Sequence, residues 1–244
     1  MKKLVTSFTL LALFLSGIAA SHFVVNKTDG TKLYFAISEV DSISFYDINS
    51  QEYVDLGLSS GTLWATCNLG ANSPEEYGDY FAWGETEPKD DFNWTAYFDT
   101  EDGGSTFKKY FNNGGLTELQ PEDDAATVKW GRSWQTPSLA QCMELYNSKY
   151  TTTTWTTLNG VKGRMVTSKS NSKSIFLPAT GFRDGTILKE SGENGDYWTR
   201  SLSTRYSYFA YDMDGSPNGS WDDGFKRCGG QVVRPVRKQK HVEE

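Results

Sequence analysis

The residues best suited to chemistry gather near the C-terminal end of the sequence, between residues 195 and 237. Tyrosine and tryptophan alternate there with acidic residues, amides and glycines. Exposed rings can stack on sugars or anchor a protein partner, while neighbouring carboxylates can bind calcium or flank a glycosidic bond. The residues that we assign to a ligand-binding site are Tyr206, Tyr208, Asp212, Asp214, Trp221, Asp223 and Phe225.

The spacing of these residues predicts one extended strand over residues 205–214. Side chains of a strand alternate between its two faces, so one row would point outward and the other toward the core. Trp221 and Phe225 would follow in the next loop and strand. The outward row would consist of Tyr206, Tyr208, Ala210, Asp212 and Asp214, and the inward row of Arg205, Ser207, Phe209, Tyr211 and Met213.

Catalysis is the least favoured function for this region. The two histidines, His22 and His241, lie near the ends of the chain, so a Ser-His-Asp, Cys-His or zinc mechanism has no histidine inside the main domain. Acids are abundant throughout, and we interpret those near the C-terminus as solvated loop charge. We therefore expect no enzyme. The acids close enough in sequence to flank a glycosidic bond are Glu193, Asp196, Asp212, Asp214, Asp222 and Asp223.

Calcium is the one cofactor that the sequence offers as a hypothesis. Asp212, Asp214, Gly215 and Asn218 place hard oxygen ligands at close spacing. The full twelve-residue loop and its terminal Glu are missing, so binding without a cofactor remains the favoured interpretation.

Bulk composition indicates one main domain rich in short strands. A chain of 244 residues can bury a sizeable core. The net charge of -7 comes from dispersed acids without a Lys/Arg stripe, which argues against a nucleic-acid partner. Aromatic residues at 14% and 23 glycines indicate strands joined by turns.

Residues 1–20 have the outline of a signal peptide, with Lys2 and Lys3, an apolar run and then small residues. The run is too short to span a bilayer, and no cysteine lies near the cleavage region. We expect a protein that is exported to the periplasm, the outer surface or the medium, that is not a lipoprotein and that has no transmembrane segment.

Residues 21–50 predict a β-hairpin segment around a tight turn at Asp29 and Gly30. Two or three short strands are expected. Their apolar positions are Val24, Leu33, Phe35, Val40, Ile43 and Phe45.

The main domain is expected over residues 51–238, followed by a tail at 239–244. Strands are predicted around 53–56 and 63–66, a single helical turn at 73–76, and a long polar surface excursion over 90–115. Residues 121–126 are predicted to begin a short helix that carries its acids at the favourable N-terminal end. Ser138 and Gln141 form a capping box for a second helix. The face of that helix expected to be apolar consists of Leu139, Cys142, Met143 and Tyr146.

Strand patterns dominate from residue 151 onward. A Thr/Trp strand leads to an Asn159-Gly160 turn, a strand over 164–167 and another over 174–178. Helices in the middle and strands toward the end predict an α+β fold.

Three cysteines leave two interpretations open. Cys142 lies in the helical pattern and is expected to be a small core residue. In an exported protein, Cys67 and Cys228 are then a candidate disulfide pair, and two buried free thiols are the alternative.

Several motifs together resemble the Fibrobacter succinogenes major paralogous domain, a family of secreted and surface proteins of Bacteroidetes. The resemblance covers roughly residues 53–238. It is carried by YVDLGLSSGTLWATCNLG, PEEYGDYFAWGE, PEDDAATVKWGRSWQTPSLAQ, SIFLPATGFRDGT, GDYWTRS and RCGGQVVRPVR.

This resemblance implies a C-type lectin-like fold, similar to that of the formylglycine-generating enzyme, with two short helices and small twisted antiparallel sheets. Loops would carry recognition, and the family implies no general activity. The chain departs from the family pattern at Cys142, Asp212 and Asp214. The oxidase chemistry of the related enzyme needs paired cysteines near the C-terminus, where this chain has Cys228 alone. The tryptophans expected to be fold residues are Trp64, Trp83, Trp130, Trp134, Trp155 and Trp198.

The first functional hypothesis is a non-catalytic binding module that recognises a glycan or a cell-surface protein. The alternative is a structural or assembly component of a bacterial surface complex, with the aromatic face as a subunit interface. A carbohydrate-active enzyme or an oxidase is the least favoured hypothesis. Arg234 and Arg237 are expected to hold buried or interfacial carboxylates rather than a ligand.

Overall fold

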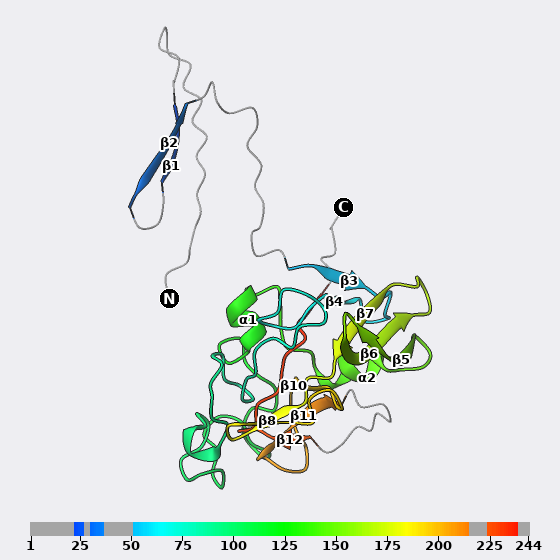
Figure 1. Ribbon diagram of the computed structural model, residues 1–244. Helices are drawn as coiled ribbons and strands as arrows, with labels where there is room; N and C mark the ends of the chain where they lie inside the picture. Colours follow the sequence, from blue (N-terminus) through cyan, green and yellow to red (C-terminus); the bar gives the residue numbers. More distant parts are fainter. Residues whose placement is uncertain (1–21, 27–29, 37–50, 215–223, 239–244) are drawn as a thin grey trace. The chain divides into compact units, whose positions relative to one another are not determined.

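The computed structural model describes residues 22–26, 30–36, 51–214 and 224–238 (Figure 1). The chain divides into two compact units, residues 1–48 and residues 49–244. Each unit is described by itself.

In the first unit, β1 (His22–Asn26) pairs antiparallel with β2 (Lys32–Ala36), as the sequence predicts. Gly30 in the connection has a φ of 85°, which a glycine adopts without strain. Asp29 and the positions expected in a third strand, Val40, Ile43 and Phe45, lie outside the described residues.

The second unit combines small antiparallel sheets with two short helices, so the α+β prediction is confirmed (Figure 1). One sheet has the order β13-β4-β3, one β5-β6-β7 and one β10-β11-β12, and β8 pairs with β9. The strands are β3 (Tyr53–Asp55), β4 (Thr62–Ala65), β5 (Thr151–Leu158), β6 (Val161–Ser168), β7 (Ser174–Pro178), β8 (Phe182–Asp184), β9 (Ile187–Lys189), β10 (Asp196–Leu202), β11 (Phe209–Asp214), β12 (Phe225–Lys226) and β13 (Val236–Lys238).

The turn between β5 and β6 confirms a local prediction. Leu158 pairs with Val161, so Asn159 and Gly160 form a two-residue loop. Both have positive φ, 49° and 86°, as a type I′ hairpin turn requires.

Both predicted helices form. α1 (Ala125–Trp130) begins after Asp124, whose carboxylate accepts hydrogen bonds from the backbone N–H groups of Ala126 and Thr127. α2 (Leu139–Leu145) has the predicted capping box between Ser138 and Gln141. A short 3-10 helix, η2 (Trp94–Ala96), lies in the region between β4 and α1.

The buried face of α2 differs from the prediction. Cys142 is buried as expected, but Met143 is 54% exposed and Leu145 takes its place in the core. Residues three apart share a helix face, whereas adjacent residues do not, so Cys142 and Leu145 pack together.

One loop prediction is wrong, because residues 73–76 form a turn rather than a turn of helix. Residues 90–115 lie mostly at the surface, as predicted, but a few side chains anchor them in the core. Phe92, Tyr97, Asp99 and Tyr110 are all buried. The sequence of residues 90–115 has a polar pattern because the few side chains that become buried are widely spaced among glycines and amides.

The core of the second unit contains most of the predicted fold tryptophans. Trp64, Trp83, Trp134 and Trp198 are fully buried, while Trp130 and Trp155 are partly exposed. Two apolar clusters form, one around Trp64, Tyr197 and Val236 and the other around Trp83, Trp198 and Val233.

Residues 227–236 run through the middle of the second unit and are buried throughout. Gln231 is bridged to Phe81 and Val232 to Tyr197. Val236 pairs with Trp64 on one side and with Gln135 on the other. This closing segment therefore connects strands that are distant in the sequence.

Among the described residues, Arg234 and Arg237 do not hold carboxylates, contrary to the prediction. Arg234 donates hydrogen bonds to Asn68 Oδ1 at 2.7 Å and to backbone carbonyls, including that of Phe176 at 2.9 Å. Arg237 lies over the rings of Tyr53 and Trp134, at 5.0 and 5.5 Å from their centroids. Carbonyl oxygens and aromatic faces supply the compensation that a carboxylate was expected to give.

The candidate disulfide is not formed: Cys67, Cys142 and Cys228 are free and buried. The Cys67 thiol donates to the carbonyl of Ala71 at 3.3 Å. Cys228 packs in the cluster around Trp64. The alternative of buried free thiols holds.

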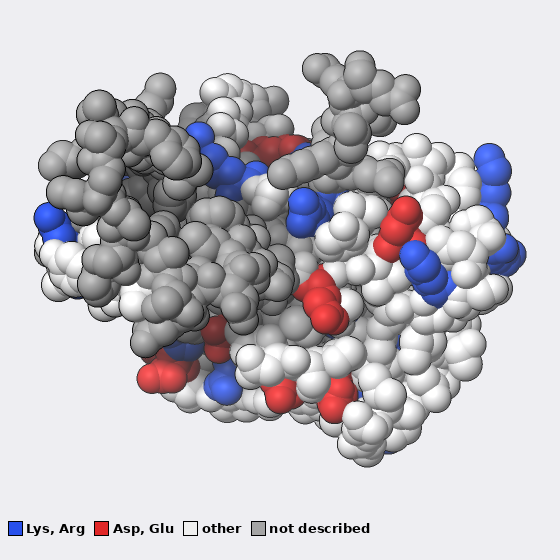
Figure 2. Space-filling view, turned by 90° about the horizontal axis from the view of Figure 1, so that it is seen from above, with Lys and Arg blue, Asp and Glu red and all other residues white. Residues whose placement is uncertain are grey.

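Basic and acidic side chains are interspersed on the face shown in Figure 2, and the described residues form no basic stripe there. Within the described part of the chain, no helix has the length and apolarity needed to cross a membrane.

Candidate binding site on the aromatic turn

The strand that was expected to begin at residue 205 begins at Phe209 instead. Residues 205–208 form a turn between β10 and β11, so the predicted alternation fails before Phe209. It also fails within β11, because Ala210 of the predicted outward row and Met213 of the inward row are both fully buried. β11 is covered on both faces.

The turn nevertheless exposes two of the predicted binding residues side by side. Tyr206 is 43% exposed and Tyr208 40%. Their rings are stacked, with centroids 5.3 Å apart and an interplanar angle of 24°. The ring of Phe209 meets both of them edge-on, at 6.0 and 4.6 Å. We call residues 203–209 the aromatic turn.

A loop distant in sequence clamps the aromatic turn. The backbone N–H of Asn112 donates to Ser207 Oγ at 3.0 Å, and Asn112 Nδ2 donates to the carbonyl of Ser203 at 3.1 Å. The hydroxyls of Thr204 and Tyr211 are 2.7 Å apart and share a hydrogen bond. Side chains on both sides thus fix the backbone of the turn.

The backbone of the aromatic turn is also closed on itself and on the closing segment. Phe209 N–H donates to the carbonyl of Tyr206 at 3.0 Å, and Ser203 N–H to that of Phe209 at 3.1 Å. Arg227 N–H donates to the carbonyl of Tyr208 at 3.0 Å. The two rings therefore stand on a backbone with few free torsions.

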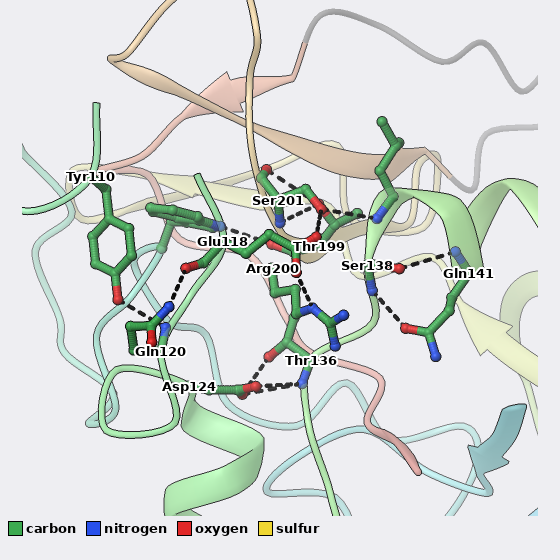
Figure 3. A network of polar contacts seen from close by, with 12 residues as sticks. Tyr110, Glu118, Gln120, Asp124, Thr136, Ser138, Gln141, Thr199, Arg200 and Ser201 are labelled. Atoms are coloured by element: carbon green, nitrogen blue, oxygen red, sulfur yellow. Dashed lines mark hydrogen bonds and ion pairs between the residues drawn. The ribbon is translucent and has the colours of Figure 1, made fainter. Parts of the chain in front are cut away.

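A polar network behind the turn holds the end of β10 in place (Figure 3). Arg200 Nε donates to Glu118 Oε2 at 2.9 Å, and Ser201 Oγ donates to the other oxygen of the same carboxylate at 3.2 Å. Leu119 N–H donates to the carbonyl of Arg200, and Leu202 N–H to that of Thr117. Residues 117–119 thus run beside β10 up to the start of the turn.

The starts of both helices belong to the same region (Figure 3). Thr136 N–H and Oγ1 both donate to the Asp124 carboxylate, and burial raises the pKa of that carboxyl despite these bonds. Arg200 N–H donates to the carbonyl of Pro137 at 2.8 Å. Residues 136–137 therefore link the first turn of α1 to β10.

Two of the predicted site residues are half-buried and contact other parts of the fold. The Asp212 carboxylate accepts a hydrogen bond from Gln231 Nε2 at 2.7 Å. Phe225 packs against the rings of Phe182 and Trp198, with centroids 4.7 and 6.4 Å away. Asp212 and Phe225 were assigned to the surface because the side-chain alternation along one strand does not show which other residues pack against that strand.

Trp221, Asp222 and Asp223 lie outside the described residues, as does the side chain of Asp214. The structure places neither the second half of the predicted binding face nor the candidate carboxylate pair.

No group of three His, Cys, Asp or Glu side chains within the described residues is placed to hold a metal ion. Gly215 and Asn218 of the calcium pattern lie beyond the described part of β11. The calcium hypothesis stays a prediction.

Three supports of the aromatic turn carry no signal in the sequence. Asn112 lies in a polar loop pattern, whereas Ser207 and Phe209 were both assigned to the inward row of a strand. Hydrogen bonds between residues 95 positions apart leave no local pattern to detect.

The arrangement offers two preorganised aromatic faces with phenol hydroxyls at their tips, which suits binding. Comparisons of the chain with protein-family models, with curated proteins and with solved structures find no match.

Proposed function

We propose that this protein is an exported binding module without catalysis, which recognises a glycan or a cell-surface protein through the aromatic turn. The observation that carries the proposal is the stacked, exposed pair of Tyr206 and Tyr208 on an immobilised backbone. Trp221 and Asp223 are proposed to complete the contact from the segment that follows β11.

Physical chemistry supports binding at this pair. A tyrosine has two side-chain torsions, so it supplies a large contact area at a low cost in conformational entropy. Here that cost is reduced further because the two rings pack on each other and on Phe209. Each ring can stack on the C–H face of a sugar or fill a pocket of a protein, while its hydroxyl remains free to hydrogen bond.

The C-type lectin-like fold is part of the proposal. The two short helices and the small antiparallel sheets support it, as do the motifs that resemble the Fibrobacter succinogenes major paralogous domain. In such a fold, binding residues stand on loops supported by a rigid scaffold, and the aromatic turn has that position.

A role in assembly is the second candidate, and the same exposed pair supports it. A second subunit would bury the tyrosine rings, which are enriched in protein interfaces. In that case association would depend on protein concentration and on the two tyrosines.

The test is a Tyr206→Ser/Tyr208→Ser double variant, with Tyr34→Ser as the control because Tyr34 is an exposed tyrosine of the other unit. Glycan arrays and binding to intact bacterial cells are measured first with the wild-type protein. We expect the double variant to lose binding at least about tenfold, which is about 1.4 kcal/mol. Its melting temperature should stay within a few degrees of wild type, since exposed side chains contribute little to stability.

An array glycan or a cell ligand that the double variant binds as tightly as the wild type does would contradict the proposed site for that ligand. Sedimentation velocity separates the second candidate: dimers of the wild type that dissociate in the double variant would favour assembly over recognition.

A further inference from the structure

A cavity lies in the same unit as the aromatic turn and shares no residue with it. It has a volume of about 350 Å³ and opens between the start of β3, the end of β4 and the end of α1. That volume is within the range of small-ligand pockets, roughly 300–1,000 Å³. The side chains that matter for its chemistry are Gln51, Glu52, Thr66, Cys67, Asn72 and Trp130.

Trp130 provides a fixed aromatic wall. It is the last residue of α1, which ends at Gly131 with a φ of 90° and a hydrogen bond back to the carbonyl of Thr127. Its ring meets the buried ring of Trp134 edge-on, with centroids 5.2 Å apart and an angle of 80°. The indole is anchored on that side and remains partly exposed where it lines the cavity.

The polar groups of the cavity have hydrogen-bonding capacity that the protein leaves unused. Within the described residues, the side chains of Gln51, Glu52 and Asn72 make no hydrogen bond to another protein group. Thr66 and the backbone of Glu52 hold the wall in place, because Thr66 N–H donates to the carbonyl of Glu52 at 3.0 Å. The cavity is thus lined by two amides and one carboxylate, and the hydrogen bond between Thr66 and Glu52 holds part of its wall in place.

The base of the cavity is small and uncharged. Cys67 is 7% exposed there and donates to the carbonyl of Ala71. Burial raises the pKa of the Cys67 thiol, so it is protonated at neutral pH and acts as a compact wall rather than as a nucleophile.

We propose that this cavity binds one neutral sugar unit, with a C–H face against the Trp130 indole and hydroxyls bonded by Gln51, Glu52 and Asn72. An aromatic wall with a few convergent amides and one carboxylate matches a ligand that has an apolar face and many hydroxyls. Glu52 disfavours sugars that carry a negative charge. This site does not depend on the proposed function of the aromatic turn.

Binding is measured by isothermal titration and by ligand-observed NMR on the full chain, with a panel of neutral methyl glycosides and disaccharides. We expect at least one of them to bind with a dissociation constant of about 0.1–10 mM, which is −5.5 to −2.7 kcal/mol, as befits a ligand of this size. The anionic uronic acids of the same panel should bind more weakly.

Asn72→Ala and Gln51→Ala are the first variants, because neither side chain makes a hydrogen bond to another described residue. Each should weaken binding at least about fivefold at an unchanged melting temperature, and Trp130→Ala should abolish it. The Tyr206→Ser/Tyr208→Ser protein is the matched control and should bind the glycosides as the wild type does. Loss of binding in that control would assign the sugar to the aromatic turn and overturn the proposal.

Absence of saturable binding up to about 50 mM of every neutral sugar, or binding that ignores Asn72→Ala and Gln51→Ala, would overturn the proposal. So would a preference for quaternary ammonium ligands, which also bind beside indoles and carboxylates.

Discussion

Arg227 and Asp99 form a fully buried ion pair, 2.6 Å apart, with exposed fractions of 0% and 1%. The guanidinium also donates to the carbonyl of Tyr110, and it lies 4.0 Å from the ring centroid of Phe107. The Asp99 carboxylate accepts the backbone N–H groups of Lys109 and Tyr110. Since each charge here compensates the other, the costs of removing the two groups should not be additive.

A double-mutant cycle tests this expectation. Arg227→Met and Asp99→Asn should each lower the free energy of unfolding by about 3 kcal/mol, because each leaves a buried polar group uncompensated. The double variant should lose clearly less than the sum of the two. Urea denaturation followed by fluorescence measures all four proteins, and additive losses would mean that the two groups do not stabilise each other.

Glu144 gives a prediction about pH. Partial burial alone would raise the pKa of its carboxyl, but hydrogen bonds from Ser59 and Ser60 outweigh that effect and lower the pKa. Because the folded-state pKa lies below the unfolded value, the stabilisation is fully present above about pH 4.3 and is lost as pH falls through the folded-state pKa.

Wild type should therefore exceed Glu144→Gln in urea midpoint at pH 7, and the difference should shrink as the pH drops below about 4. A difference that is constant from pH 7 to pH 3 would show that the carboxylate charge contributes nothing. The measurement is a series of urea titrations of both proteins.

At the scale of elements, caps and turns that depend on neighbouring residues could be predicted from the sequence. Contacts between residues distant in the sequence could not. The capping box at Ser138 and the Asn159-Gly160 turn act within a few residues, so their consequences can be read locally. The aromatic turn depends on Asn112, and the buried anchors Asp99 and Tyr110 depend on Arg227. The tertiary fold brings such partners together, and no periodic pattern in the sequence predicts them.

The entry into β12 gives the element-scale prediction. Gly224 has a φ of 97°, and a Cβ there would lie 2.0 Å from the carbonyl oxygen of Ala210. Gly160 also has a positive φ, but a Cβ there would meet nothing within 4 Å. Gly160→Ala should thus cost only the backbone term of about 1–2 kcal/mol.

Gly224→Ala should cost more than Gly160→Ala, because the ladder between β11 and β12 must also shift. Thermal and urea denaturation of both variants measures the two losses of stability for comparison. Equal losses would indicate that β12 moves aside without cost and contributes little to the sheet.

At the scale of the whole second unit, the closing segment joins parts that would otherwise be separate. It is bridged to Phe81, Tyr197, Trp64 and Gln135, and it provides Arg227 and Arg234, which are both fully buried. A chain that ends at residue 226 should therefore lack fixed tertiary packing. We expect its near-UV circular dichroism, dominated by the tryptophans, to collapse, whereas secondary structure is partly retained. A native near-UV spectrum would show that the remaining strands close the core alone.

The three buried cysteines have a consequence for the conditions under which the protein can fold. None of them is bonded, and burial raises the pKa of the Cys228 thiol to about 11 and that of Cys142 still further. All three thiols stay protonated and shielded at neutral pH, and no cross-link has to form before the core closes. Maturation of this chain therefore needs no oxidant, and the folded protein should be equally stable in air, under strict anaerobiosis and in millimolar reductant.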